Sequence, residues 1–532
     1  NLLAGRLLSR AEDVSILETL NVPVVQLIRL HNQSPEEWRA DAGGLGAGAQ
    51  SMVYSLSQPE MAGVIEPTAV AASRSEIDAL TGLHYRKYVP LEERIEHLCR
   101  RLHRLIRLRT LPHREKRLTI VLHNNPCKGV EATLGLAAGL DAFASLGDLI
   151  RALRETGYDV GDAPEDGAAL LDLLLERKAV SEFRWTTTDE IVAKGGVLHS
   201  TTKDEYMNIL ARLPDRARQR IEADWGDFPG EGMVHRQDGE DVLLVTGLRF
   251  GNLQIMVQPK RGCYGAKCNG EVCRILHDPH LSPPPHWLAA YRYIRDTSDA
   301  VLHFGAHGSL EFLPGKQTAL SDECFPEISL DDLPNIYLYV MDAPGEGLAA
   351  KRRGRAVLVD HLTPAYRPAE LDQDLLALEQ LLEQRQKAEA NGETARRNLL
   401  REQMLPLMRR LRFIDREELP SDRFDEVAPL LSRQIARCRR TLTPLGLHRL
   451  GTAPAPESIA AMLATILIKP AEDLPSLEEI AQWSAAPSGN VFNDARDLIQ
   501  SLLDPQPAPT PEKAEPARFA ALLRWSRETG NG

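Results

Sequence analysis

The stretch Val301-Leu-His-Phe-Gly-Ala-His-Gly-Ser-Leu-Glu-Phe-Leu-Pro-Gly-Lys316 joins a short apolar run to a dense group of chemically active side chains. The apolar residues are typical of a buried strand, and the glycines that follow loosen the backbone. Within this segment lie two imidazoles, a carboxylate and an ammonium group: His303, His307, Glu311 and Lys316. Such side chains in a glycine-rich segment indicate a functional site rather than a core.

A second dense stretch, Asp342-Ala-Pro-Gly-Glu-Gly-Leu-Ala-Ala-Lys-Arg-Arg353, follows the apolar run Asn335–Val340. Its acidic residue Glu346 and its basic end repeat the order of a strand followed by a polar loop. Open parallel sheets place ligands at the carboxyl ends of their strands. We therefore expect the two stretches to face each other across a cleft.

The composition of the 532 residues is that of an ordinary globular protein, with 43% hydrophobic and 26% charged residues. The formal net charge of −12, from 63 basic and 75 acidic residues, argues against nucleic-acid binding. No apolar run approaches the roughly 20 residues of a membrane span. Seven cysteines are too few for a disulfide framework, so we expect a reducing cytoplasm.

The order of apolar runs and polar loops predicts an α/β fold with parallel-sheet units around a cleft, followed by a mainly α-helical region. We expect four parts. Residues 1–110 form the end of an α/β domain plus a basic connecting helix, and residues 111–365 form the α/β core with the site. Residues 366–503 form a helical domain, and residues 504–532 form a Pro-rich linker and a short terminal helix.

The basic segment Glu92–Arg109 has apolar residues at helical spacing and many Arg and His residues on its other face. A basic amphipathic helix can bind membranes or nucleic acid. Because the whole chain is acidic, we instead expect this face to be solvated or to contact another subunit.

The spacing of His303, His307 and Glu311 is i, i+4 and i+8, which on a helix would place all three on one face. The intervening glycines and Pro314 disfavour a continuous helix, so a loop would have to bring the side chains together. Two interpretations stay open: a metal or general-base site, and a hydrogen-bonded loop. The strand predicted at Arg117–His123 places Asn124 at the same edge as a further cleft candidate.

Two other motif interpretations are weaker. The segment ending in Gly315-Lys316 is not a P-loop, because the first glycine is too distant and Gln317 replaces the Mg²⁺-binding Ser or Thr. We therefore expect no ATP hydrolysis by this chain itself. Three thiols at Cys263, Cys268 and Cys273 suggest either a zinc or cluster site or ordinary loop thiols, and their spacing favours the second.

Taken together in their order, the motifs of the chain resemble those of the large subunit of class I tetrapyrrole metal chelatases, of the CobN cobaltochelatase type and the related magnesium chelatase H type. The resembling runs, in family order, are Asn125-Pro126, Gly139-Leu-Asp141, Phe250-Gly-Asn252, Gln258-Pro-Lys-Arg-Gly262, His303–Lys316, Ser321-Asp-Glu-Cys-Phe-Pro326, Pro344-Gly-Glu-Gly347, Lys351-Arg-Arg353 and Val359-Asp-His-Leu-Thr-Pro364. Members of this family are usually more than twice as long, so the chain resembles a central portion of one.

The resemblance implies an ATP-dependent ligase that inserts Co²⁺ into a corrin-type ring such as hydrogenobyrinic acid a,c-diamide. Separate AAA+ ATPase and adaptor subunits would supply ATP hydrolysis. We predict metal ligation by His303, His307 and Glu311, and catalytic roles for Glu311, Glu346 and His307. We predict macrocycle binding by Lys316, Lys351, Arg352, Asn124 and Arg261.

Two alternatives stay open. The first is a chelatase subunit of the magnesium type that inserts Mg²⁺ into protoporphyrin IX, and the second is a carrier or sensor that binds a tetrapyrrole without catalysis. A hydrolytic metalloenzyme is disfavoured, because the spacing matches no known metalloprotease signature.

Overall fold

The fold is described from a computed structural model, which divides into two compact units. It describes residues 19, 21–124, 133–182, 186–261, 278–305, 308–340, 343–369, 372–414, 420–439, 441–469, 474–485, 487–504 and 511–530. One unit comprises residues 1–363 with 448–452, and the other comprises residues 364–447 with 453–532.

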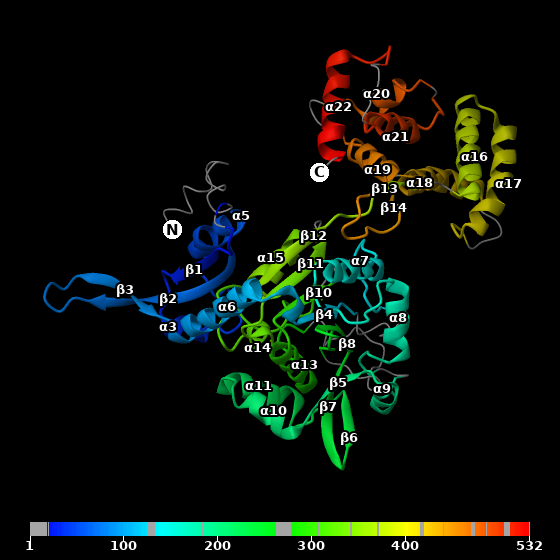
Figure 1. The fold of residues 1–532 in the computed structure, drawn as a ribbon. Coiled ribbons are helices and arrows are strands. Elements are labelled where there is room, and N and C mark those ends of the chain that lie inside the picture. The colour runs from blue at the N-terminus through cyan, green and yellow to red at the C-terminus, as the bar shows by residue number, and fades with distance from the viewer. Residues whose placement is uncertain are drawn as a thin grey trace. The chain divides into compact units, whose positions relative to one another are not determined.

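A six-stranded sheet in the order β12-β11-β10-β4-β9-β8 forms the centre of the first unit (Figure 1). Its strands are β4 (Leu118–Leu122), β8 (Leu248–Phe250), β9 (Leu253–Val257), β10 (Ala300–Phe304), β11 (Asn335–Val340) and β12 (Ala356–His361). Five strands are parallel, and only β8 runs antiparallel to its neighbour β9. The loops after the five parallel strands therefore begin at one edge of the sheet.

The alternation of side chains along each strand divides the core into two layers. Ile120 and Phe304 pack on one face of the sheet together with α7 (Ala142–Glu155) and α8 (Gly167–Glu176). Val121 and Val301 pack on the other face with α13 (Pro285–Thr297). Near-continuous apolar strands are expected for a parallel sheet that is covered on both faces.

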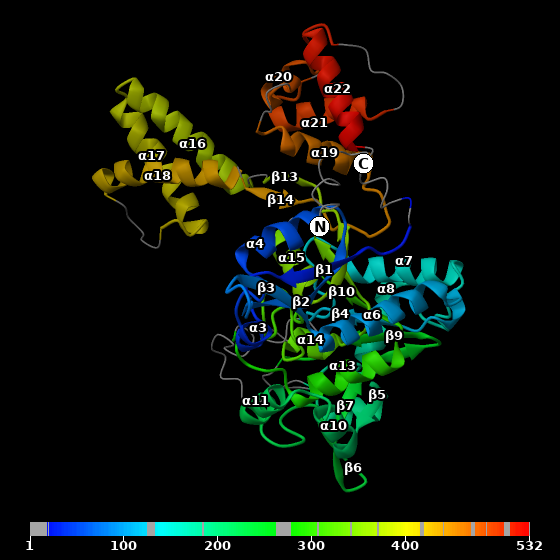
Figure 2. The same cartoon turned by 90° about the vertical axis from the view of Figure 1, so that its left-hand side faces the viewer.

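Two smaller sheets flank this centre. The first is β1 (Val25–Leu30), β2 (Ile65–Ile77) and β3 (His84–Pro90). The second is β5 (Val197–Thr201), β7 (Glu240–Thr246) and β6 (Val234–Gln237). α13 packs against β7, and the turned view in Figure 2 shows the two elements side by side.

The remaining elements of the first unit are short, apart from one long helix. They are α3 (Pro35–Ala40), α4 (Ala49–Ser51), η1 (Met52–Ser57), α5 (Gln58–Met61), α6 (Glu92–Thr110), η2 (His113–Glu115), α9 (Thr188–Lys194), α10 (Lys203–Leu210), α11 (Asp215–Trp225), α14 (Phe325–Leu330) and α15 (Pro344–Arg353). The segment 201–225, which has the pattern of a surface helix, is divided into α10 and α11 because Pro214 lies between them.

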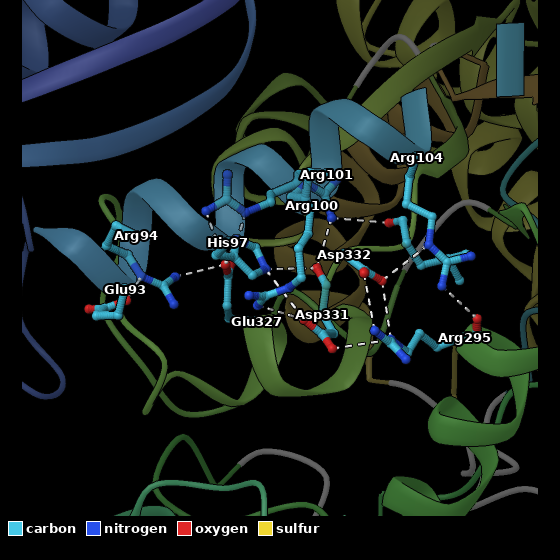
Figure 3. A network of polar contacts seen from close by, with 12 residues as sticks. Glu93, Arg94, His97, Arg100, Arg101, Arg104, Arg295, Glu327, Asp331 and Asp332 are labelled. Carbon is cyan, nitrogen blue, oxygen red and sulfur yellow. Dashed lines mark hydrogen bonds and ion pairs between the residues drawn. The ribbon is translucent and has the colours of Figure 1, made fainter. Parts of the chain in front are cut away.

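The basic side chains of α6 divide into two groups: Arg100, His103, Arg107 and Arg109 are solvent-exposed, as expected, whereas three others are buried within this chain, which was not expected. Arg94, His97 and Arg101 are each exposed by 3% or less. Figure 3 shows the acidic groups that receive them: Arg94 Nη1 lies 2.8 Å from Glu327 Oε1, and Asp331 and Asp332 pair with neighbouring arginines. The charge pattern of α6 therefore reflects in part burial against acidic residues distant in sequence, which helical periodicity alone does not reveal.

The second unit is mainly helical. Its elements are β13 (Tyr366–Pro368), α16 (Gln373–Ala390), α17 (Thr394–Arg410), α18 (Ser421–Arg439), β14 (Leu442–Pro444), α19 (Pro456–Ile466), α20 (Leu477–Gln482), α21 (Val491–Leu502) and α22 (Pro516–Gly530). One core joins α16, α17 and α18, and a separate core joins α19 to α22. The predicted fold class, α/β units followed by helices, is confirmed. Residues 505–510 of the predicted linker lie outside the described residues.

Candidate site at the carboxyl edge of the central sheet

The loop after β10 begins at Gly305, which lies against the end of β4. A Cβ at Gly305 would lie 2.3 Å from the Cβ of His123, so only glycine permits this close approach. The adjacent strands β4 and β10 therefore deliver their loops side by side, as the strand–loop order predicts.

Glu311 supplies the carboxyl group of this loop, and its pKa is strongly shifted. Its side chain is 1% exposed, and Oε1 accepts a hydrogen bond of 3.1 Å from the backbone N–H of Gly308. Oε2 has no hydrogen-bond partner among the described residues. Burial raises the pKa of Glu311 to about 7, and the negative charge of Glu346 contributes to the rise. Glu311 is thus placed to gain and lose a proton near neutral pH.

Position 308 has no room for a side chain, so glycine is required there. A Cβ at this position would lie 2.0 Å from the Tyr337 hydroxyl and 2.1 Å from Glu311 Oε2. Tyr337 on β11 and Glu311 therefore converge on the same point from two segments. Burial holds the pKa of Tyr337 well above its ordinary value, and the charge of Glu311 adds to this effect.

Glu346 supplies a second carboxylate from the first turn of α15, which starts with Pro344. The N-terminal turn of a helix is a favourable place for a negative charge. The hydroxyl of Tyr339, a buried residue of β11, donates a 2.8 Å hydrogen bond to Glu346 Oε2. The two dense stretches therefore come close enough for the charge of Glu346 to act on Glu311, while a cleft between them stays a prediction.

Arg353, at the end of α15, holds the two stretches together. Its buried guanidinium donates hydrogen bonds to the backbone carbonyls of Glu311 (2.6 Å), Gly315 (3.1 Å) and Lys316 (2.5 Å), and also to that of Leu313. Sequence reasoning did not single out this residue from its basic neighbours. The three consecutive cations gave no local signal that distinguishes Arg353, because its partners are backbone carbonyls of another segment.

His303 lies inside the core with both ring nitrogens engaged. Nδ1 is 2.7 Å from Asn335 Oδ1, and Nε2 is 3.0 Å from the hydroxyl of Tyr291. Burial lowers the pKa of His303 to about 4, so the ring is neutral at physiological pH. Metal ligation by His303 stays a prediction, and it requires one of these hydrogen bonds to break.

Two of the predicted macrocycle-binding cations already contact other side chains of this chain. Lys316 is fully buried, with Nζ 3.0 Å from Ser321 Oγ and 5.2 Å from the centre of a Trp38 ring. Arg352 forms an ion pair of 2.7 Å with Glu60. For either side chain, macrocycle binding stays a prediction that requires loss of these contacts. Lys351 is half-buried, and no hydrogen bond or ion pair joins it to the described residues.

Asn124 and Arg261 follow β4 and β9 and are both buried. Asn124 Oδ1 accepts a 2.6 Å hydrogen bond from Thr133, and Arg261 donates one of 2.7 Å to the carbonyl of Asp278. Burial lowers the pKa of Arg261 to about 10, and the positive charge of Arg353 acts in the same direction. Arg261 therefore lies close enough to the Arg353 region to sense its charge.

His307, Asp342 and the three cysteines Cys263, Cys268 and Cys273 lie outside the described residues. Among the residues that the structure does describe, no group of three or more His, Cys, Asp or Glu side chains is arranged to hold a metal ion. The described part of the site is therefore a pair of carboxylates framed by two tyrosines, at the edge where five parallel strands end.

The comparisons with known proteins agree with this arrangement. Residues 3–510 match the family described as CobN/Magnesium Chelatase. The chain belongs to the CobN/magnesium chelatase family. This confirms the resemblance drawn from the sequence motifs. The fold of this chelatase-family chain is also similar to a solved structure, the catalytic subunit of cobaltochelatase from Mycobacterium tuberculosis. That match has a TM-score of 0.77 and 29% identity, over 98% of this chain and 44% of the other.

Relatives from both branches of the family match the chain. Aerobic cobaltochelatase subunit CobN of Pseudomonas aeruginosa is 34% identical over 447 residues, which are 82% of this chain and 33% of the relative. The H-type magnesium-chelatase subunit of Rhodobacter capsulatus is 34% identical over 387 residues, 69% of this chain and 30% of the relative. An uncharacterized protein of Methanocaldococcus jannaschii is 37% identical over 470 residues, 86% of this chain and 38% of the relative. The chain thus matches only 30–38% of the length of these relatives.

No helix among the described residues is both long and apolar enough to cross a membrane.

Proposed function

We propose that this chain forms the metal-insertion site of the large subunit of an ATP-dependent chelatase, which inserts Co²⁺ into a corrin-type ring such as hydrogenobyrinic acid a,c-diamide. The observation that supports this most is the pair Glu311 and Glu346, which follow β10 and β11 and lie close enough for the charge of Glu346 to raise the pKa of Glu311. One carboxylate is buried with a free oxygen and titrates near pH 7, and the other is held by Tyr339.

The proposed chemistry needs two functions at one place. A divalent ion must exchange its water ligands for ring nitrogens, and the ring must release its N–H hydrogen as protons when the ion enters. Carboxylate oxygen and imidazole nitrogen are suitable transient ligands for Co²⁺, and carboxylates also suit Mg²⁺. We assign metal transfer to Glu311, His307 and Glu346, and proton acceptance to Glu311, whose pKa lies close to the pH of the reaction.

The remaining assignments follow from what each side chain already contacts. His303, with both ring nitrogens hydrogen-bonded, serves to position β10 beside β11, and it becomes a metal ligand only if a bond to Tyr291 or Asn335 breaks. Lys351, without a described partner, is the first candidate for a macrocycle carboxylate. Asn124 and Arg261 are candidates at the neighbouring strand ends, while Lys316 and Arg352 would first have to leave Trp38 and Glu60.

Partner subunits belong to the same proposal. ATP and its Mg²⁺ would be used by AAA+ ATPase and adaptor subunits, since no phosphate-binding P-loop was found in this sequence. A cytoplasmic location is likewise proposed from the few cysteines. Insertion of Mg²⁺ into protoporphyrin IX is the second candidate, because relatives of both types match at 34% identity.

The test is an insertion assay with the full-length polypeptide, its ATPase partners and ATP, using Co²⁺, Mg²⁺ and Ni²⁺ against a corrin-type ring and protoporphyrin IX. We expect Co²⁺ insertion into the corrin-type ring, and a fall of roughly a hundredfold or more for Glu311→Gln, as is typical on loss of a proton-transfer group. Glu323→Gln, an acid on the same unit with no assigned role, is the matched control.

Three results would contradict parts of the proposal. Magnesium insertion into protoporphyrin IX would reassign the metal and ring. Ring binding without insertion of any metal would identify a carrier or sensor instead. Full activity of Glu346→Gln would remove that residue from the mechanism.

A further inference from the structure

An apolar cavity lies on the opposite face of the central sheet from Glu311 and Glu346. It has a volume of about 290 Å³, at the lower end of the range for small-molecule pockets, and its lining is almost entirely apolar. The lining includes Ile120, Leu302 and Leu338 from three adjacent strands, and Leu149 and Leu153 from α7.

Strand alternation keeps this cavity separate from the candidate chelation site. Leu302 and Leu338 point to the face covered by α7, whereas their neighbours His303 and Tyr337 point to the other face. A ligand in the cavity would therefore have the sheet between itself and the two carboxylates. Val359 on β12 also lines the cavity and is 40% exposed, so this side opens to solvent.

One cation stands in the apolar lining. The Lys116 side chain is 8% exposed, and its ammonium group lies 5.5 Å from the centre of the Tyr158 ring, which also lines the cavity. No ion pair or hydrogen bond joins this ammonium to any described residue. The described residues offer this ammonium an aromatic face and no counter-charge, so it is open to a charge-assisted contact with an anion. The cavity is therefore complementary to a ligand that has an apolar part and one anionic group.

We propose that this cavity binds an amphipathic monocarboxylate, with its apolar chain against the sheet and α7 and its carboxylate paired with Lys116. The apolar lining favours an apolar chain, because its binding removes apolar surface from water. A charge-assisted contact to the Lys116 ammonium accounts for the carboxylate. This site is independent of the proposed metal insertion, since it shares no residue with it.

The test uses isothermal titration calorimetry of the whole chain with decanoate, and with 1-decanol and decylamine as probes of the same chain length. We expect decanoate to bind at least tenfold more tightly than either control. Lys116→Met, which keeps an unbranched apolar side chain and removes the charge, should abolish the preference and leave 1-decanol binding unchanged. Lys203→Met, at an exposed lysine of α10, should leave all three affinities unchanged.

Val359→Trp, which places a large side chain at the cavity mouth, should weaken decanoate and 1-decanol alike, and it keeps the test decisive if Lys116→Met does not fold. The proposal is overturned if decanoate binds no better than 1-decanol, or if Lys116→Met retains the preference. A third result would also overturn the proposal, namely that a second copy of the chain covers the cavity opening at Val359. Sedimentation would then show a dimer that excess decanoate does not dissociate.

Discussion

At the scale of single residues, the candidate site depends on one unusual carboxyl group. Glu311 is buried beside a second carboxylate, and both effects favour its protonated form. A carboxyl group with an ordinary pKa of 4.5 would be fully ionised at neutral pH, whereas this one is only partly ionised there. Part of the environment that creates this property comes from Tyr337 of β11, which is distant from Glu311 in the sequence.

We predict that Glu311 makes stability depend on pH with a definite sign. Because its pKa is raised to about 7 in the folded chain, the folded state binds more protons than the unfolded state between the ordinary value of 4.5 and about 7. The free energy of unfolding of the wild type should therefore fall relative to Glu311→Gln as pH rises through this range, and level off above it. Urea denaturation at several pH values measures the difference, and a flat difference between pH 4.5 and 7 would show that Glu311 is not perturbed.

At the scale of elements, α15 and the loop after β10 behave as one structural piece. The two stretches are separated by β11 and α14 in the chain, yet Arg353 fixes the carbonyls on either side of Pro314. A planar guanidinium suits this task because its five N–H donors point in fixed directions. Arg353, for which no catalytic or binding role was predicted, therefore sets the position of Glu311 relative to Glu346.

We predict that Arg353→Lys loosens this piece. A lysine offers three donors on a flexible chain, so most of the four carbonyl contacts should be lost, at a cost of roughly 2–4 kcal/mol in the free energy of unfolding. Hydrogen exchange of the backbone amides at residues 311–316 should become faster. The matched control is Arg352→Lys on the same helix, whose partner is Glu60 and whose loss should leave these amides protected. Equal protection in both variants would show that Arg353 does not hold the loop.

At the scale of the whole molecule, buried ion pairs join the β1–β3 sheet and α6 to the central sheet of the first unit. Glu327 on α14 contacts Arg94 of α6 and Arg355 before β12, and Arg101 forms a bidentate pair with Glu66 of β2. Burial by itself would raise the pKa of Glu327, but the surrounding cations hold it well below its ordinary value. Such a network specifies one docking arrangement, because removing a single charge leaves its partners unbalanced.

We predict that Glu327→Gln lowers the free energy of unfolding of the first unit by about 3–5 kcal/mol, since two buried arginines each lose one of their two acidic partners. The second unit has its own cores, so calorimetry should show two transitions, of which only one moves. Glu323→Gln removes a partly exposed acid 3.5 Å from Arg216 and should shift neither transition by more than about 1 kcal/mol. A shift of both transitions by Glu327→Gln would show that the units unfold together.

The sequence by itself determined the strand-and-loop order, the helical C-terminal region and the family. These depend on local patterns: apolar runs that suit a sheet covered on both faces, polar loops after them, and motifs at characteristic spacing. It also predicted that the loops after β10 and β11 meet, because neighbouring parallel strands end at one edge.

Only the tertiary structure decided which polar side chains are available for chemistry. Lys316 packs against Trp38, and the ring of His303 is hydrogen-bonded to Asn335 and Tyr291. Arg94 of α6 forms an ion pair with Glu327. Trp38 and Glu327 lie far along the chain from the residues they contact, and Tyr291 and Asn335 lie on other elements than His303. Burial, counter-charges and hydrogen-bond partners are properties of the packed chain, so no local pattern distinguishes a lysine in solvent from one fully buried against a tryptophan.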